Sequence, residues 1–212
     1  MSKKRTEVPD FTQWTVIGRG DERTCFGNPD DPRRCIKVSS RERAKQSHRE
    51  IRYYRYLKKR GIPFSHIPEF FRVIETETFI GIEQERILDP SGRSPDDMRH
   101  YLKQPLSASE QKAFWDAMAD LKSYLVKYNV IPCDLVMSNM LIVKSGAGLE
   151  IKMVDGLGGA EFIPFSNYLR FFGKRKIDRK WQKFVDSIVR PHFELYQNHE
   201  ATPGQTTGSG NE

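Results

Sequence analysis

The first half of the chain alternates short apolar runs with turn-forming residues, and this pattern predicts strands. We expect strands at residues 12–18, 23–26, 33–38, 70–75 and 78–87. Turn residues from Asn28 to Pro32 separate the second run from the third, which indicates a hairpin. The last two runs predict another hairpin, because they also follow each other closely in the sequence.

One helix is predicted between these two groups of strands. Over residues 41–59, apolar and aromatic side chains recur at helical spacing. The face that we expect to be buried consists of Ala44, His48, Ile51, Tyr54 and Leu57. Basic residues and then Gly61 mark the end of the helix, because glycine readily adopts the left-handed conformation that closes one.

The second half is predicted to be mainly helical. Ser107 or Ser109 can cap a helix that runs to about Asn129. Its apolar stripe has the spacing of a core-facing helix and consists of Phe114, Met118, Leu121, Leu125 and Tyr128. A short hairpin is expected at residues 140–143 and 151–154, and a last helix at about 178–189, ending near Pro191.

Together these elements predict an α+β fold: an N-terminal antiparallel sheet with one helix, then a short, mainly helical lobe. We divide the chain into a flexible lead-in (1–10), an N-terminal lobe (11–88), a shortened C-terminal lobe (89–198) and a disordered tail (199–212). The tail is rich in glycine, serine and threonine, a composition that disfavours a packed core. A chain of 212 residues can bury a core without disulfides or metals.

Composition narrows the class of protein. Lysine and arginine number 35 against 28 acidic residues, so the formal net charge is +7 and an anionic partner is expected. Cys25, Cys35 and Cys133 show neither a disulfide framework nor metal-ligand spacing, which favours reduced thiols in the cytoplasm. No apolar run approaches the roughly 18 residues of a membrane-spanning helix, and no signal peptide is expected.

Five elements that can bind phosphate or metal follow one another along the chain. They are Gly18 with Gly20 after the first strand, Lys37 on the third strand, Glu50 on the next helix, Asp134 with Asn139 after the long helix, and Asp155 after the following strand. Protein kinases use a glycine-rich loop, a strand lysine paired to a helix glutamate, a catalytic Asp with a later Asn, and a metal-binding Asp in this order. The order therefore predicts a kinase-like nucleotide site.

Each residue type suits its expected role. Lys37, held by Glu50, would bring positive charge to phosphate oxygens, which glycine backbones can approach closely. Asn139 and Asp155 offer the hard oxygen ligands that Mg²⁺ prefers, and Asp134 can accept the proton of a hydroxyl nucleophile.

Glu85 and Ile87, at the end of the fifth predicted strand, complete the expected nucleotide-binding set, and ATP and Mg²⁺ are the expected cofactors. Taken singly, each of these signals has an ordinary structural explanation. The glycines can form a simple turn, Lys37 can be solvated, and Glu50 can form a surface ion pair with a neighbouring arginine. The hypothesis rests on the joint order.

The chain also resembles a known family. The stretches that carry the resemblance are Arg34-Cys35-Ile36-Lys37-Val38, Arg49-Glu50-Ile51-Arg52-Tyr53-Tyr54, Ser138-Asn139-Met140-Leu141 and residues 155–164. They resemble the YrbL family, the PhoP-regulatory-network proteins, over most of residues 18–184. The resemblance implies a kinase-like fold, a cytosolic bacterial protein and a regulatory role. The chain is more distantly similar to kinases that phosphorylate lipopolysaccharide core sugars.

The kinase pattern is incomplete around the predicted catalytic residue. Pro132 and Cys133 stand where protein kinases have His and Arg, and Val136 stands where they often have Lys. Gly156 and Leu157 follow Asp155 in place of Phe-Gly, and no Ala-Pro-Glu motif follows. Small molecules, sugars or lipids are therefore better expected acceptors than proteins.

Three hypotheses follow from these patterns. The first is an ATP-dependent phosphotransferase with Asp134 as base and Asn139 and Asp155 as Mg²⁺ ligands. The second is a pseudokinase, a nucleotide-binding regulator without transfer, which the missing charge at Val136 favours. The third is a nucleic-acid-binding module, which leaves the ordered acidic residues unexplained.

Basic and aromatic residues alternate between residues 168 and 184. The basic ones are Arg170, Lys174, Arg175, Lys176, Arg179, Lys180 and Lys183, and the aromatic ones are Tyr168, Phe171, Phe172, Trp181 and Phe184. One interpretation is a surface at residues 170–183 for nucleic acid or anionic lipid. The spacing favours a helix that buries Trp181, Phe184, Ile188 and Val189 and leaves its lysines in water. No motif predicts base-specific recognition.

Overall fold

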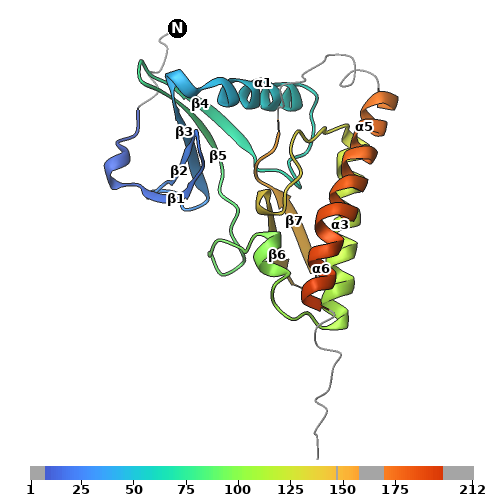
Figure 1. Ribbon diagram of the computed structural model, residues 1–212. Coiled ribbons are helices and arrows are strands. Elements are labelled where there is room, and N and C mark those ends of the chain that lie inside the picture. Colours follow the sequence, from blue (N-terminus) through green and yellow to red (C-terminus); the bar gives the residue numbers. More distant parts are fainter. Residues whose placement is uncertain (1–7, 147, 158–169, 198–212) are drawn as a thin grey trace, which may run out of the picture.

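Five short strands of the N-terminal part pair into one antiparallel sheet (Figure 1). The computed structural model describes residues 8–146, 148–157 and 170–197. The strands are β1 (Thr15–Arg19), β2 (Thr24–Gly27), β3 (Arg34–Ser40), β4 (Phe70–Glu75) and β5 (Phe79–Glu85), in the spatial order β1-β2-β3-β5-β4. Every run predicted as a strand in this part contains one, with bounds that differ by a few residues.

The prediction for the first strand is wrong at its beginning. Phe11–Gln13 forms a short 3₁₀ helix, η1, and β1 begins only at Thr15. The Asp10 carboxylate accepts a hydrogen bond from the Thr12 N–H at 3.0 Å and so closes a turn there. The Phe11 ring then packs on Phe26, with the ring centroids 4.9 Å apart.

Helix α1 (Lys45–Lys59) follows a 3₁₀ turn, η2 (Arg41–Arg43), so the predicted helix begins too early. The prediction that His48 belongs to the buried face is also wrong, because His48 is exposed. Ser47 and Glu50 are buried in that region, since this face of α1 meets β3. The hydroxyl groups of Ser39 and Ser47 form a hydrogen bond of 2.8 Å between the two elements.

The second half contains more helix than strand. Its helices before the hairpin are α2 (Met98–Tyr101), which the sequence patterns did not predict, and α3 (Ala108–Tyr128). Ser107 rather than Ser109 caps α3, because its side chain accepts from Glu110 N–H while the Glu110 side chain accepts from Ser107 N–H. Asn129 ends α3 in the left-handed conformation, with φ of 53°.

A 3₁₀ turn, η3 (Met137–Asn139), leads into a two-stranded sheet of β6 (Met140–Ser145) and β7 (Gly148–Met153). Both strands of the predicted hairpin are present with longer bounds. Strand β7 packs against α3, which places the end of β7 close to the core.

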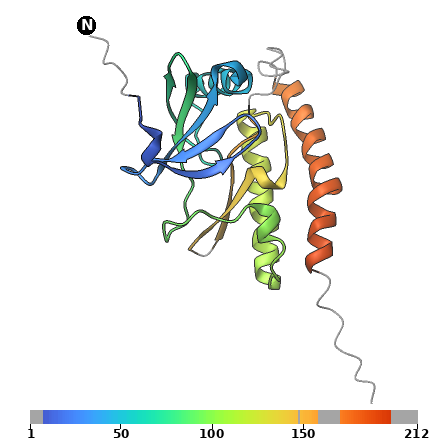
Figure 2. The ribbon, with the colours of Figure 1, turned by 60° about the vertical axis from the view of Figure 1, so that its left-hand side comes forward.

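The last helical region is longer than predicted. Helix α5 (Arg170–Phe184) continues through a π-helical turn (Val185–Val189) into α6 (Arg190–Gln197), and Figures 1 and 2 show them as one long rod beside α3. The prediction that the helix ends near Pro191 is wrong. Pro191 lies inside this continuous rod, directly after the π-helical turn, where the regular α-helical hydrogen-bond pattern is already interrupted, so its missing N–H is accommodated there.

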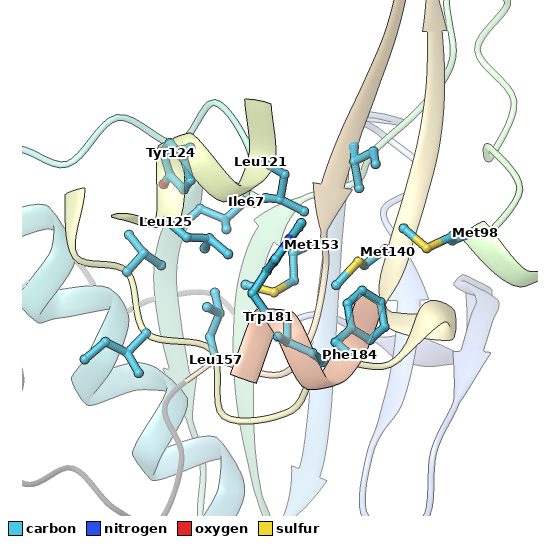
Figure 3. Packing of buried hydrophobic residues seen from close by; sticks show 14 of the residues in the cluster. Ile67, Met98, Leu121, Tyr124, Leu125, Met140, Met153, Leu157, Trp181 and Phe184 are labelled. Carbon is cyan, nitrogen blue, oxygen red and sulfur yellow. The ribbon is translucent and has the colours of Figure 1, made fainter. Parts of the chain in front are cut away.

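Helix α5 has a buried apolar face and an exposed basic face. Ile177, Trp181 and Phe184 are buried, and Figure 3 shows Trp181 and Phe184 pointing toward Met153 and Met140. The prediction that Ile188 is buried is wrong, because 37% of it is exposed. Phe171 and Phe172 are exposed as well, and the predicted anionic partner of this segment stays a prediction. Tyr168 lies outside the described residues.

One hydrophobic cluster connects the two halves of the chain. It contains buried residues of α1, β4, β5, α2, α3, β6, β7 and α5. The predicted lobe boundaries stay predictions, and the predicted tail (199–212) and most of the lead-in lie outside the described residues. Within the described part of the chain, no helix is long and apolar enough to span a bilayer.

Candidate functional site

A cavity of about 710 Å³ lies between the sheet and the segments that flank the β6–β7 hairpin. It brings together seven residues that the sequence singled out: Gly18, Gly20, Lys37, Glu85, Ile87, Asn139 and Asp155. The two remaining candidates lie next to it, since Glu50 contacts Lys37 and Asp134 lines an adjoining cavity. Residues from distant parts of the sequence therefore meet at one place.

Lys37 is a buried cation held by three oxygen groups. Its Nζ lies 3.4 Å from Glu50 Oε1 and 4.0 Å from Asp155 Oδ2, and it donates a hydrogen bond of 2.7 Å to the Val154 carbonyl. Burial lowers the pKa of Lys37, but the charges of Glu50 and Asp155 outweigh that effect and raise the pKa above its ordinary value. Lys37 is therefore a fixed positive charge on the cavity wall.

Asp155 is ionised for a related reason. Burial opposes its ionisation, but the charges of Lys37 and Arg23 outweigh burial and lower the pKa of Asp155 below its ordinary value. Its Oδ1 also accepts a hydrogen bond of 2.7 Å from the Gly156 N–H. A carboxylate in this state can serve as a metal ligand at neutral pH.

Arg23 is a central residue of the cluster that the sequence patterns did not identify. Its guanidinium donates to Glu50 Oε2 through one nitrogen and to Asp155 Oδ2 through the other, the latter at 2.6 Å. Only 8% of its side chain is exposed. A buried guanidinium needs such partners, because an unpaired buried charge is costly. The one sequence signal for Arg23 is its position three residues after Gly20.

The loop that carries Asp134 is held against the segment after β7 through the backbone. The Gly156 carbonyl accepts a hydrogen bond of 2.8 Å from Cys133 N–H, and the Asn139 carbonyl accepts one of 2.8 Å from Val154 N–H. Gly156 has φ of +83°, and a Cβ there would lie 2.2 Å from the Asp134 carbonyl oxygen. Any residue other than glycine would therefore have a strained backbone at this position and would clash with the Asp134 carbonyl.

Helix α5 supports the same loop from outside. Lys180 Nζ donates hydrogen bonds to the carbonyls of Pro132 at 3.0 Å and Cys133 at 2.7 Å. The Asp134 carboxylate is exposed to the adjoining cavity, which also contacts Asn139 and Asp155. The loop thus presents an exposed carboxylate next to the Lys37–Asp155 cluster.

Within the described part of the chain, two buried polar atoms of residues on the cavity lining have no hydrogen-bond partner. They are Gln84 Oε1 and Arg86 Nε, an acceptor and a donor near the end of β5. Buried polar groups are nearly always satisfied in folded proteins. Both residues line the cavity at the end of β5, although these two atoms themselves are covered by the protein.

The oxygen-bearing side chains on the cavity wall also fit a divalent cation that is coordinated by a phosphate at the same time. Within the described residues, no group of three or more His, Cys, Asp or Glu side chains could hold a metal ion by itself. Asn139 and Asp155 both line the cavity, and two protein oxygens leave coordination positions for phosphate oxygens and water. That arrangement is typical of Mg²⁺ bound together with a nucleotide.

Two cysteines complete the cavity wall. Cys25 on β2 pairs with Lys37 on β3, and Cys35 lies on the same side of the strand pair. A hydrogen bond with Cys35 lowers the pKa of the Cys25 thiol against the opposing effect of burial, and the charge of Lys37 lowers it further.

Comparisons with known proteins match most of the chain. A family model described as "PhoP regulatory network protein YrbL" matches residues 10–188. Two similar curated proteins, each named "Uncharacterized protein YrbL", come from Escherichia coli (strain K12) and Shigella flexneri. Each is 26% identical over 179 residues, which is 82% of this chain and 85% of the relative.

Proposed function

We propose that this chain, which belongs to the PhoP regulatory network protein YrbL family, has a kinase-like fold and binds ATP with Mg²⁺ in the 710 Å³ cavity. The observation that carries the proposal is the buried Lys37–Glu50 pair next to Asp155. Kinases use a lysine of the third strand, a glutamate of the following helix and a metal-binding aspartate in this combination. The order of β1, β2, β3, α1, β4 and β5 supports the same proposal.

Each residue of the site has a role in this proposal. Lys37 binds the α- and β-phosphates and Glu50 positions Lys37, while the backbone near Gly18 and Gly20 covers the phosphates. The base lies against the segment from Gln84 to Ile87, all four residues of which line the cavity. Asn139 and Asp155 would hold Mg²⁺, which would neutralise part of the negative charge of the phosphates.

We further propose phosphoryl transfer to a hydroxyl group of a small molecule, a sugar or a lipid. The exposed carboxylate of Asp134 next to the cluster supports this step, because a general base must be able to reach the proton that it accepts. A cytoplasmic location is part of the same proposal, and the free thiols of Cys25, Cys35 and Cys133 support it.

A nucleotide-binding regulator without transfer is the second candidate. Arg23 engages both Glu50 and Asp155, so a metal that binds Asp155 Oδ2 competes with Arg23 for this oxygen. Val136 adds no positive charge to the loop of Asp134. A regulator in a PhoP-linked network could respond to nucleotide through this exchange of partners.

Isothermal titration of ATP, with and without Mg²⁺, tests the proposed function on the native chain, Asp155→Ala and Asp116→Ala. Asp116 is an exposed carboxylate on α3, so its variant is a matched control. We expect the native chain and the control to bind only with Mg²⁺, and Asp155→Ala to lose about tenfold or more in affinity. Equal binding by all three proteins, or none by the native chain, contradicts the proposal.

Asp134→Ala separates the two candidates once ATP binding is established. A phosphotransferase consumes ATP in the presence of an acceptor, and Asp134→Ala binds ATP but does not consume it. A regulator binds ATP in both forms, and neither form consumes it with any acceptor.

A further inference from the structure

A second cavity, of about 510 Å³, adjoins the first and shares Gly20, Arg23, Asn139 and Asp155 with it. The remaining lining residues are Asp21, Glu22, Lys45, Gln46, Arg49, Cys133, Asp134 and Gly156. Among the residues that the structure describes, this lining contains no aromatic and no large aliphatic side chain, so it fits a strongly polar molecule. Its volume is typical of a small-molecule site.

The first turns of α1 supply positive charge to one wall. Lys45 and Arg49 lie one helical turn apart on the same face, with Gln46 beside them, and all three line the cavity. Within the part of the chain that the structure describes, neither Lys45 nor Arg49 has a hydrogen bond or ion pair from its side chain. Both charges are thus available to a ligand.

Carboxylates occupy other parts of the lining and set the orientation of a ligand. Asp134 belongs to the loop after α3, whereas Asp21 and Glu22 belong to the turn between β1 and β2. An anionic group is repelled by these three residues and by Asp155, which also lines the cavity, and is attracted to the wall of Lys45 and Arg49. A hydroxyl group, in contrast, can donate a hydrogen bond to the Asp134 carboxylate.

We propose that this second cavity binds the phosphoryl acceptor and that the acceptor is a small hydroxyl compound carrying an oxyanion, a phosphate or a carboxylate. The oxyanion lies against Lys45 and Arg49, and the hydroxyl group faces Asp134. The assignment as an acceptor site rests on the proposed phosphoryl transfer, whereas the oxyanion site does not depend on nucleotide binding.

In the transfer step, the acceptor oxygen forms a bond to the γ-phosphorus of ATP while the bond from that phosphorus to the ADP oxygen breaks. The hydroxyl proton passes to Asp134, and ADP leaves with the electron pair of the broken bond. The four residues shared by the two cavities lie where the two substrates would meet.

Nuclear magnetic resonance titrations of the ¹⁵N-labelled full chain test the oxyanion site, with inorganic phosphate and acetate as probes and no nucleotide or Mg²⁺. The test variant is Lys45→Ala/Arg49→Ala. The matched control is Arg55→Ala/Lys59→Ala, two exposed cations at the same spacing on α1 that do not line the cavity. We expect phosphate to shift the backbone amides of residues 45–49 in the native chain and the control, and affinity to fall about fivefold in the test variant.

The two probes distinguish the source of the oxyanion. Shifts with phosphate alone indicate a phosphate ester, and shifts with both probes indicate that a carboxylate is also accepted. The inference is overturned if residues 45–49 show no shifts with either probe, or if the two double variants weaken binding equally.

Failure of the oxyanion-site inference can be distinguished from failure of the proposed function. Phosphate binding at α1 in a chain that does not bind ATP keeps the oxyanion site and removes the kinase proposal. ATP binding in a chain whose phosphate affinity is unchanged by Lys45→Ala/Arg49→Ala keeps the proposed function and removes this inference.

Discussion

Gly156 shows at the scale of one residue how the site is held together. Its φ of +83° is strained for other residues, and an added Cβ would meet the Asp134 carbonyl at 2.2 Å. We expect Gly156→Ala to lower the free energy of unfolding by about 2–4 kcal/mol, because strain and a backbone clash add. Urea unfolding measures this loss.

Gly92→Ala is the matched control, because Gly92 has φ of +82° but no atom of the described residues lies within 4 Å of the added Cβ. Its cost should be about 1 kcal/mol, from the conformation alone. Equal losses in the two variants would show that the approach of Asp134 to Gly156 does not constrain the fold.

The depressed pKa of Asp155 predicts a pH dependence of stability. A carboxylate whose pKa is lower in the folded state stabilises the fold above its ordinary pKa of about 4, and this contribution is lost as the pH falls through the folded value. We expect Asp155→Asn to cost about 1–3 kcal/mol at pH 7. The difference in free energy of unfolding between this variant and the native chain, measured by urea unfolding, should become smaller below about pH 4.

Asp116→Asn, on an exposed carboxylate, should show neither effect. The pairing of Asp155 with Lys37 and Arg23 would be contradicted if Asp155→Asn lowered the free energy of unfolding by the same amount at neutral and at acid pH.

Single residues differ in how far the sequence could predict them. Lys37, Glu50 and Asp155 were found because their order along the chain matches a known pattern, and the structure does bring them together. Arg23 could not be found, because its partners lie 27 and 132 residues away and only folding brings them to it. The roles of all these residues in binding nucleotide stay predictions.

At the scale of elements, local sequence patterns predicted which helices and strands exist better than they predicted where each one begins and ends. Alternating residues placed the strands, but η1 depends on a side-chain hydrogen bond from Thr12 N–H to Asp10 that no periodicity reveals. The buried face of α1 turned toward Glu50 rather than His48 because β3 lies there. Helix α6 was missed, because a proline such as Pro191 usually ends a helix, but here it follows a π-helical turn that the sequence patterns did not predict.

The packing of α5 can be tested with two phenylalanines of the same helix. Phe184 is buried in the common core and Phe172 is exposed. Phe184→Ala should lower the free energy of unfolding by about 3–5 kcal/mol through lost burial and a cavity, whereas Phe172→Ala should change it by less than about 0.5 kcal/mol. Similar losses in urea unfolding would argue against the packing of this helix.

At the scale of the whole molecule, the core argues for one cooperative unit. The hydrophobic cluster runs from α1 to α5, and the Tyr53 hydroxyl on α1 accepts a hydrogen bond of 2.8 Å from Ile131 N–H before the Asp134 loop. We therefore expect a single urea transition in which circular dichroism and tryptophan fluorescence coincide.

Tyr53→Phe should lower the free energy of unfolding by about 1–3 kcal/mol, because it leaves a buried N–H without its acceptor. The variant should still unfold in a single transition. Tyr56→Phe, on a half-buried residue of the same helix, should shift it much less. Two separate transitions in the native chain would show that the predicted lobes unfold independently.

The thiol of Cys25 makes the larger cavity accessible to covalent chemistry. It lines the cavity beside Lys37, and its lowered pKa increases the fraction of reactive thiolate. If the cavity binds a purine as proposed, an acrylamide attached to a purine analogue could therefore form a thioether with Cys25. Such an adduct would keep the analogue in place irreversibly, and the mass of the modified tryptic peptide would report where it had bound.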